Sequence, residues 1–484
     1  MLISGRWFIR ASLLVPLVGL AACGGGDGSL FPGDGGNGAD ATNPNHGDGS
    51  SSTDGGLSFG DGACSTLACH QVACPGGGST TLSGTVSDPA GKVPLYNVIV
   101  YIPTTAVKPI TVGATCDQCG GEVTGDPLVS TITDAKGQFV LKNVPAGVPL
   151  PLVMQIGKWR RQITLPAAKA CMANMAADQN LTRLPRNQGE GDLPRIAIST
   201  GGADPLECLL RKIGIDDAEF MTAGGAGRVH LYAGSGVPNA QPPLVAAAQF
   251  APSLNGGAAF AGSQAMWSDP SKLAAYDLLL LACEGQQNAN TKPPAALQAM
   301  YQFESMGGRV FASHWHDYWF ASGPAPLPST GSWTDLTPPP PDPSDGTLDT
   351  SFPKGQALHD WLANVGGLNP NGTLPIKQAK HNLNSVGNGA QQWITMPNPN
   401  ATPAGQTAVE YMTFNTPLDV DAGAQCGRVV YSDLHVSSGD MTGQPFPLGC
   451  VTKDLSPQEK ALEFMLFDLS SCILGDNQPP VPPK

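Results

Sequence analysis

The sequence predicts a multidomain protein in which a small antiparallel β-sandwich is followed by an α/β domain with a doubly wound, flavodoxin-like sheet. Between residues 81 and 141, short β-branched runs are separated by turns rich in Asp, Pro and Gly, a pattern typical of antiparallel strands. From residue 195 onward, short apolar strands alternate with helical stretches, as in a doubly wound sheet. We therefore assign residues 63–185 to the sandwich with its Cys-rich start, and residues 190–474 to the α/β domain.

An export signal occupies residues 1–22, where Arg6 and Arg10 precede an apolar stretch that ends in small residues. About a dozen apolar residues are too few to cross a bilayer, which takes roughly twenty. Residues 20–23, Leu-Ala-Ala-Cys, resemble the bacterial lipobox. This resemblance implies cleavage before Cys23 and the attachment of diacylglycerol and a further acyl chain such as palmitate to that residue. The alternative is an ordinary signal peptide with a chance cysteine.

A flexible, lipid-anchored linker is expected over residues 23–62, which are almost entirely Gly, Asp, Ser, Asn, Thr and Pro. Such a composition cannot bury enough apolar surface to offset the entropy of ordering. Gly24, rather than Asp, follows Cys23, which in the enterobacterial pattern implies sorting to the outer membrane. We expect an exported protein held on the cell envelope, with a short tail at 475–484.

The charge balance narrows the expected partners. A net charge of −13 argues against nucleic acid, because nucleic-acid binding depends on Lys and Arg that neutralise phosphates. It also gives little attraction to anionic lipid, so contact with the membrane depends on the lipid anchor. An envelope glycan or protein is the expected partner.

The cysteine content predicts disulfides, because an exported chain matures in an oxidising compartment. Cys116 and Cys119 also have the spacing of a zinc site, whose other ligands would come from Cys64, Cys69, His70 or Cys74. The odd number of candidates leaves one thiol free or paired with another molecule. The disulfide candidates are Cys64, Cys69, Cys74, Cys116, Cys119, Cys171, Cys208, Cys283, Cys426, Cys450 and Cys472.

The first folded part has an ordered set of turn motifs. Residues 84–91 read Gly-x-Val-x-Asp-x-x-Gly, residues 94–100 read Pro-Leu-x-x-Val-x-Val, residues 133–139 read Thr-Asp-x-x-Gly-x-Phe, and residues 144–147 read Val-Pro-Ala-Gly. This order resembles the carboxypeptidase regulatory-like family, whose transthyretin-like sandwich is a non-catalytic module. An insertion with Cys116 and Cys119 departs from that pattern. Residues 158–161, Lys-Trp-Arg-Arg, predict either a basic binding edge or an edge strand protected by charge.

The second folded part alternates strands and helices. Asp204 and Pro205 are the expected cap and first-turn proline of the first helix, and Ser456 with Glu459 forms a capping signature for the last. The expected helices cover residues 205–212, 294–306 and 456–472. The expected strands cover residues 195–199, 228–232, 277–282, 309–313, 392–395, 410–414 and 427–432.

Several of these pieces resemble the class I glutamine amidotransferase-like superfamily, especially its trehalose-utilisation branch. They are the strand at 276–280, the helix that ends in Gly-Gly at 307–308, the strand at 310–314 that ends in His, and the Gly-Arg-Val strand at 427–429. Members with amidotransferase activity carry a nucleophilic Cys in a Gly-x-Cys-x-Gly elbow. Here residues 312–316 read Ala-Ser-His-Trp-His, which predicts a degenerate domain without that chemistry.

Polar residues gather at two strand ends, where ligands bind in α/β sheets. His314, His316 and Asp317 follow one strand, and Asp433 and His435 follow another. Because alternate side chains on a strand point the same way, His314, His316, Asp433 and His435 could together hold zinc or iron. The alternative is a hydrogen-bonded polar pocket or aromatic packing.

Cys283, at the end of the preceding strand, has two interpretations. It could act as a nucleophile with His435 as its base, or it could be a structural cysteine bridged to Cys208. If the strands that end at 199, 282, 313 and 432 are parallel, His314, His316 and His435 should lie close together.

Two functions follow from these patterns. The first, which we prefer, is a non-catalytic binding or scaffold lipoprotein that presents a crevice to a glycan, peptide or protein. The alternative is a metal-dependent or Cys/His hydrolase that acts on an envelope or sugar substrate, with His314, His435 and Cys283 as candidate catalytic residues.

Overall fold

The computed structural model describes residues 66–335, 337–435 and 439–483, which belong to a compact unit over residues 63–484. The signal peptide, Cys23, the linker and Cys64 lie outside the described residues, so the predictions on them stay predictions. Within the described ranges, no helix is both long and apolar enough to cross a membrane.

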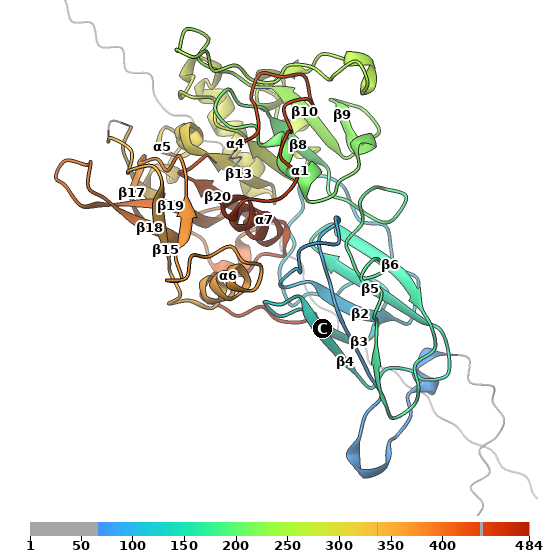
Figure 1. Cartoon of the computed structure of the whole chain (residues 1–484). Helices are drawn as coiled ribbons and strands as arrows, with labels where there is room; N and C mark the ends of the chain where they lie inside the picture. The colour runs from blue at the N-terminus through green and yellow to red at the C-terminus, as the bar shows by residue number, and fades with distance from the viewer. Residues whose placement is uncertain (1–65, 336, 436–438, 484) are drawn as a thin grey trace, which may run out of the picture. The chain divides into compact units, whose positions relative to one another are not determined.

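The first part of this unit contains two small sheets (Figure 1). One sheet has the order β4 (Gln138–Lys142), β1 (Thr81–Thr85) and β7 (Ala173–Met175). The other has the order β3 (Pro127–Ile132), β2 (Ile99–Pro103), β5 (Leu150–Ile156) and β6 (Trp159–Leu165), all antiparallel. The expected alternation is clear in β4, where Phe139 and Leu141 are buried between exposed neighbours. Apolar residues of both sheets share one core.

Residues 158–161 were predicted as a basic binding edge or as an edge strand protected by charge. β6 is an edge strand of its sheet, but the predicted exposure is wrong for Trp159 and Arg160, which are buried inside the unit. Trp159 is buried against Phe467, with ring centroids 5.6 Å apart. Arg160 is buried too, and its Nη2 lies 2.7 Å from Asp192 Oδ2. Lys158 Nζ lies 2.6 Å from Asp277 Oδ1.

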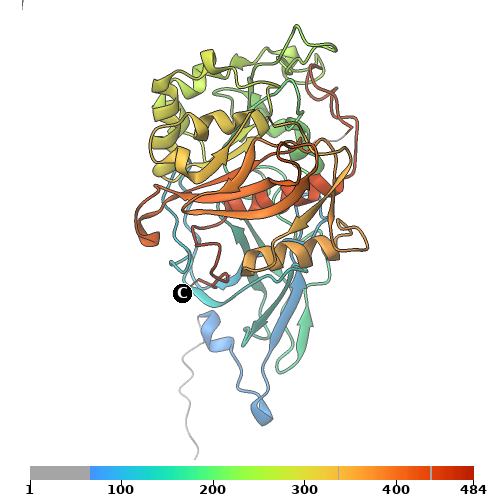
Figure 2. The same cartoon turned by 90° about the vertical axis from the view of Figure 1, so that its left-hand side faces the viewer.

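The second part is built on an 11-stranded sheet with seven strands in a parallel part and four in an antiparallel part. The parallel strands are β11 (Ala261–Gly262), β10 (Val229–Ala233), β8 (Ile196–Ser199), β12 (Leu278–Leu281), β13 (Arg309–Ser313) and β20 (Gly427–Ser432), with β9 (Phe220–Thr222) paired to β10. The antiparallel strands that follow are β19 (Gln406–Thr416), β18 (Ala390–Asn398), β15 (Ser344–Leu348) and β16 (Leu374–Ile376). Figure 2 shows the long orange strands of this antiparallel part.

The predicted parallel order of β8, β12, β13 and β20 is therefore confirmed. The predicted strands at 392–395 and 410–414 exist but run antiparallel, as parts of β18 and β19. A small additional sheet joins β14 (Gly331–Trp333) to β17 (Leu383–Val386). The described chain is mostly β, with several sheets and few helices.

Four helices of six residues or more lie in the described residues: α1 (Glu207–Lys212), α4 (Pro294–Ser305), α6 (Pro353–Asn364) and α7 (Pro457–Ser470). The predicted capping box of α7 is present, since Ser456 and Glu459 exchange hydrogen bonds. The predicted cap of α1 is wrong. That helix begins at Glu207, and Asp204 instead accepts a hydrogen bond from Ser313 Oγ at 3.1 Å.

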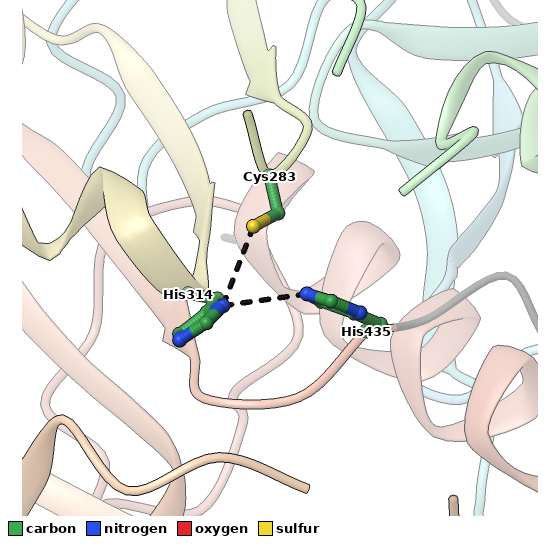
Figure 3. A group of neighbouring side chains, drawn as sticks. All are labelled: Cys283, His314 and His435. Carbon is green, nitrogen blue, oxygen red and sulfur yellow. Dashed lines mark hydrogen bonds between the residues drawn. The ribbon is translucent and has the colours of Figure 1, made fainter. Parts of the chain in front are cut away.

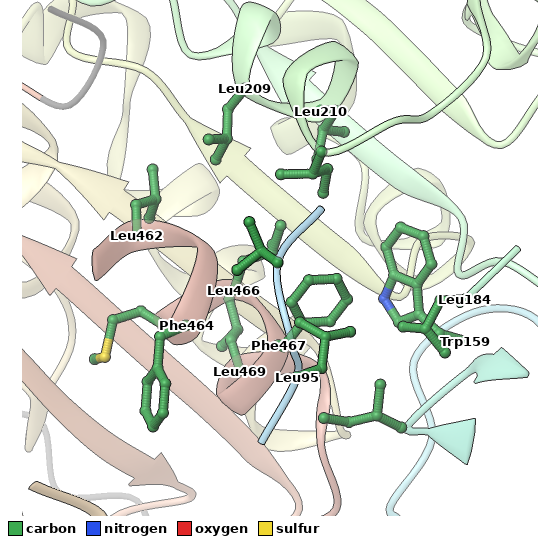
Figure 4. Packing of buried hydrophobic residues seen from close by; sticks show 14 of the residues in the cluster. Leu95, Trp159, Leu184, Leu209, Leu210, Leu462, Phe464, Leu466, Phe467 and Leu469 are labelled. Carbon is green, nitrogen blue, oxygen red and sulfur yellow. The ribbon is translucent and has the colours of Figure 1, made fainter. Parts of the chain in front are cut away.

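The two parts share one hydrophobic core (Figure 4). Leu95, Trp159 and Leu184 of the first part belong to the same buried cluster as side chains of α1 and α7. Tyr96 stacks on Phe464 of α7, with ring centroids 5.5 Å apart. Removing this apolar area from water stabilises the unit by roughly 25 cal/mol per Å².

Disulfides add covalent links. Cys74 pairs with Cys171, Cys116 with Cys426, Cys119 with Cys472, and Cys208 with Cys450. The zinc alternative for Cys116 and Cys119 is wrong, because both sulfurs are bonded elsewhere. The predicted bridge between Cys283 and Cys208 is also wrong, because Cys208 takes Cys450. Of the described cysteines, exposed Cys69 and buried Cys283 are free. This disulfide content indicates an exported protein outside the reducing cytoplasm.

Candidate metal centre

Three predicted candidates meet where the parallel strands end (Figure 3). Cys283 follows β12, His314 follows β13, and His435 follows β20. His314 Nδ1 lies 3.3 Å from Cys283 Sγ and 3.3 Å from His435 Nε2. The strands β12, β13 and β20 are neighbours in the sheet, so their carboxyl ends bring these side chains together.

His314 occupies an unusual backbone position. It has φ of 45°, in the left-handed region, and it begins the 3-10 turn η6 (His314–Asp317) immediately after β13. A residue other than glycine in this region is uncommon, and such positions occur often at functional sites. Tyr431 supports the turn, since its hydroxyl donates a hydrogen bond to His314 O at 3.1 Å. The turn directs the imidazole toward Cys283 and His435.

Amide side chains orient both imidazoles. His435 Nδ1 lies 3.1 Å from Gln378 Oε1, an acceptor, so this nitrogen carries the proton and Nε2 presents a lone pair to His314. His314 forms a second hydrogen bond with the side chain of Asn382, whose Nδ2 donates to Asp317 Oδ2 at 3.1 Å. Such outer partners are typical of metal-binding histidines.

The electrostatics keep both rings neutral. Burial, reinforced by His435 and Lys380, holds the pKa of His314 well below its usual range. Burial and Lys380 lower the pKa of His435 to about 3. At 3.3 Å, a proton on one nitrogen or a bound cation can bridge His314 Nδ1 and His435 Nε2. The arrangement is suited to a cation.

Cys283 is fully buried, and burial raises the pKa of its thiol to about 12. The backbone N–H groups of Trp315 and Gly285 oppose this rise, and the Gly285 N–H donates to Sγ at 3.4 Å. Without a metal, this thiol is protonated at neutral pH and is a poor nucleophile. A coordinated metal ion would displace the proton outright.

A buried ion pair positions the segment that follows Cys283. Glu284 Oε2 lies 2.6 Å from Lys292 Nζ, and both side chains are almost completely buried. Glu284 also accepts a hydrogen bond from Ser235 N at 2.9 Å. Lys292 Nζ lies 5.7 Å from the Trp267 ring and 5.9 Å from the Trp319 ring, a cation–π arrangement. No local pattern in the sequence marks these residues, because they meet only in the folded chain.

The structure does not bring His316 or Asp433 into this group. His316 Nε2 lies 2.9 Å from Ala282 O, and its Nδ1 accepts from Trp319 Nε1 at 3.0 Å, so both nitrogens are occupied. Asp433 accepts from Tyr431 and from backbone N–H groups near Asn382. The expected alternation does not hold, because β13 ends at Ser313 and β20 at Ser432, before these side chains.

The group offers one sulfur and two nitrogen ligands. Over the described ranges, it is the one set of three or more His, Cys, Asp or Glu side chains whose ligand atoms lie within 4.8 Å of one another. A thiolate with two imidazoles suits zinc or copper. Non-haem iron sites that use two histidines also need a carboxylate, so these residues do not fit the iron alternative.

Comparisons with known proteins leave the family open. No family model matches the chain, and no curated protein matches it. Among solved structures, the chain is similar to a type II cohesin–X-dockerin complex from Acetivibrio cellulolyticus, with 18% identity over 30% of this chain and 78% of that chain, and a TM-score of 0.15. This score does not establish a shared fold.

Proposed function

We propose that this chain is an exported envelope lipoprotein that binds one transition-metal ion through Cys283, His314 and His435. The observation that carries the proposal is the convergence of one sulfur and two imidazole nitrogens, each ring already oriented by an amide side chain. Such preorganisation lowers the cost of binding an ion. We propose a binding role, because burial raises the pKa of the Cys283 thiol and makes it a weak nucleophile.

Two sequence features support the anchored location. The lipobox-like residues 20–23 place a lipid at Cys23, and the Gly- and Ser-rich linker would separate the folded unit from the membrane surface, which we propose is that of the outer membrane. The disulfides agree with maturation outside the cytoplasm.

The family resemblances belong to the same proposal. We assign the first part to the carboxypeptidase regulatory-like sandwiches and the second to the degenerate amidotransferase-like, flavodoxin-type domains. The parallel strands β8, β12, β13 and β20 support the second assignment. The tight turn after β13 carries His314 in place of a nucleophilic cysteine. A metal-binding histidine would then stand at this strand end, where the related enzymes have the cysteine that performs acyl transfer.

A second candidate function is a thiol hydrolase with Cys283 as nucleophile and His314 as base. The 3.3 Å separation of Cys283 Sγ and His314 Nδ1 favours it. It predicts that a small alkylating reagent labels Cys283 in the folded protein, with a rate that falls when His314 is replaced. The metal-binding proposal predicts that bound metal protects Cys283 from the reagent.

The deciding experiment is metal analysis of the mature chain purified from the envelope. We expect about one equivalent of metal in the wild type and loss of this metal in Cys283→Ser and His435→Gln. Two matched controls, Cys69→Ser and His359→Gln, alter a free thiol and an imidazole outside the centre and should keep it. A wild-type protein that neither contains nor takes up zinc or copper would contradict the proposal.

A further inference from the structure

We infer that the ion held by Cys283, His314 and His435 is copper in its monovalent state. This inference rests on the proposed metal-binding function and specifies the ion. It follows from the number of ligands, their chemistry and the charge that the buried site can accept.

The number of ligands is three within the described residues. Zinc takes four ligands, so a zinc ion here would need a water or another group in its fourth position. Cys283 is completely buried and His314 is 5% exposed, which restricts access of water to two of the three ligands. Trigonal coordination by one cysteine and two histidines is instead a known copper geometry.

The sulfur and nitrogen ligands are also compatible with Cu(I). Thiolate is a soft ligand that suits Cu(I) as well as zinc, and neutral imidazole suits both metals. Among divalent metals, copper stands above zinc in the affinity order at such sites, so the donor set gives zinc no advantage.

The net charge of the occupied site also favours a monovalent ion. A thiolate and a monovalent cation together are neutral, whereas a thiolate and Zn²⁺ leave one positive charge in a buried site. Lys380 already acts with its positive charge on Cys283, His314 and His435, while the carboxylate of Asp204 acts on Cys283. Burying uncompensated charge is costly, so the monovalent ion is favoured.

Entry to the site is from the side of His435, which is half-buried while the other two ligands are buried. Its partner Gln378 is exposed and lies at the same side. Gln378 is therefore a positioning residue whose replacement should weaken binding without disturbing the core. Loss of an outer partner of a metal ligand typically lowers metal affinity by about 10- to 100-fold.

The test is a competition on the mature chain under anaerobic conditions, with Cu(I) buffered by a chelator and Zn(II) in tenfold excess. We expect about one Cu(I) and no zinc per chain. Cys283→Ser should lower Cu(I) affinity by more than about 100-fold, Gln378→Leu by about 10- to 100-fold, and Cys69→Ser should not change it. Thermal unfolding of each variant without metal checks that it folds.

The results that would contradict the copper assignment differ from those that would contradict metal binding itself. Stoichiometric zinc that resists Cu(I) would overturn the copper assignment and leave the proposed metal-binding function intact. Absence of both metals would overturn both proposals. Equal Cu(I) affinity in the wild type and in folded Cys283→Ser and Gln378→Leu proteins would show that copper binds elsewhere and overturn the inference.

Discussion

His314 Nδ1 lies 3.3 Å from His435 Nε2, although 121 residues separate the two histidines in the chain. His435 Nδ1 is hydrogen-bonded to the side chain of Gln378, and His314 is hydrogen-bonded to the side chain of Asn382. The prediction that parallel strand ends bring these two histidines together is therefore confirmed. An ion that binds between the rings of the folded unit would stabilise that unit.

Metal should stabilise the wild-type unit against heat. An ion that binds the folded state alone at about one hundred times its Kd adds about 2.7 kcal/mol to the free energy of unfolding. Calorimetry with metal and with a chelator should show a midpoint higher by a few degrees with metal. Cys283→Ser should show no such difference. An equal increase in both proteins would place the stabilising ion at another site.

Lipidation should depend on Cys23 alone. Only its thiol can accept diacylglycerol in the lipobox-like sequence, so Cys23→Ala should leave the protein unlipidated. Labelled palmitate fed to the producing cells should mark the wild type and spare the mutant. Equal labelling of the two proteins would contradict the assignment of residues 20–23.

Features of the fold and of the site that follow from local sequence patterns could be predicted, and those that depend on contacts between distant segments could not. The parallel strands were predictable, because strands buried on both faces are apolar throughout, as in Leu278–Leu281. The antiparallel direction of β18 and β19 was not predictable, because the alternation of apolar and polar residues in a strand does not show which way the strand runs. The His314 turn and the amides of Gln378 and Asn382 were missed, since they depend on backbone angles and contacts between distant segments.

The thiol count of the unfolded, unreduced protein should be low. Eight cysteines are paired in the described residues, so we expect at most about three free thiols in the mature chain. Titration in denaturant with a chromogenic thiol reagent measures this number. Eight or more free thiols would refute the disulfide assignment and return Cys116 and Cys119 to zinc binding.

Stability should fall as pH rises because of Glu207. Burial, with smaller contributions from Asp204 and Asp440, raises the pKa of this carboxyl from 4.5 to about 8. The folded state therefore holds a proton that the unfolded state releases, and the associated stability is present below pH 4.5 and lost progressively up to about pH 8. The loss is on the order of a few kcal/mol.

Glu207→Gln tests this directly, because the amide keeps the shape and cannot ionise. Its free energy of unfolding, measured by denaturant titration, should decline less than that of the wild type between pH 5 and about pH 8. Glu122→Gln, at an exposed position, is the matched control and should follow the wild type. Parallel pH curves for Glu207→Gln and the wild type would show that another group dominates.

The disulfides of Cys116 and Cys119 set the order in which this protein can mature. Their partners, Cys426 and Cys472, lie near the end of the chain, with sequence separations of 310 and 353 residues. During translocation the early pair reaches the oxidising side long before its partners, and the two thiols are free to join each other. Correct closure must wait for the last residues to cross, so we expect maturation to depend on a delayed oxidation step or on an isomerase that reopens the premature bond.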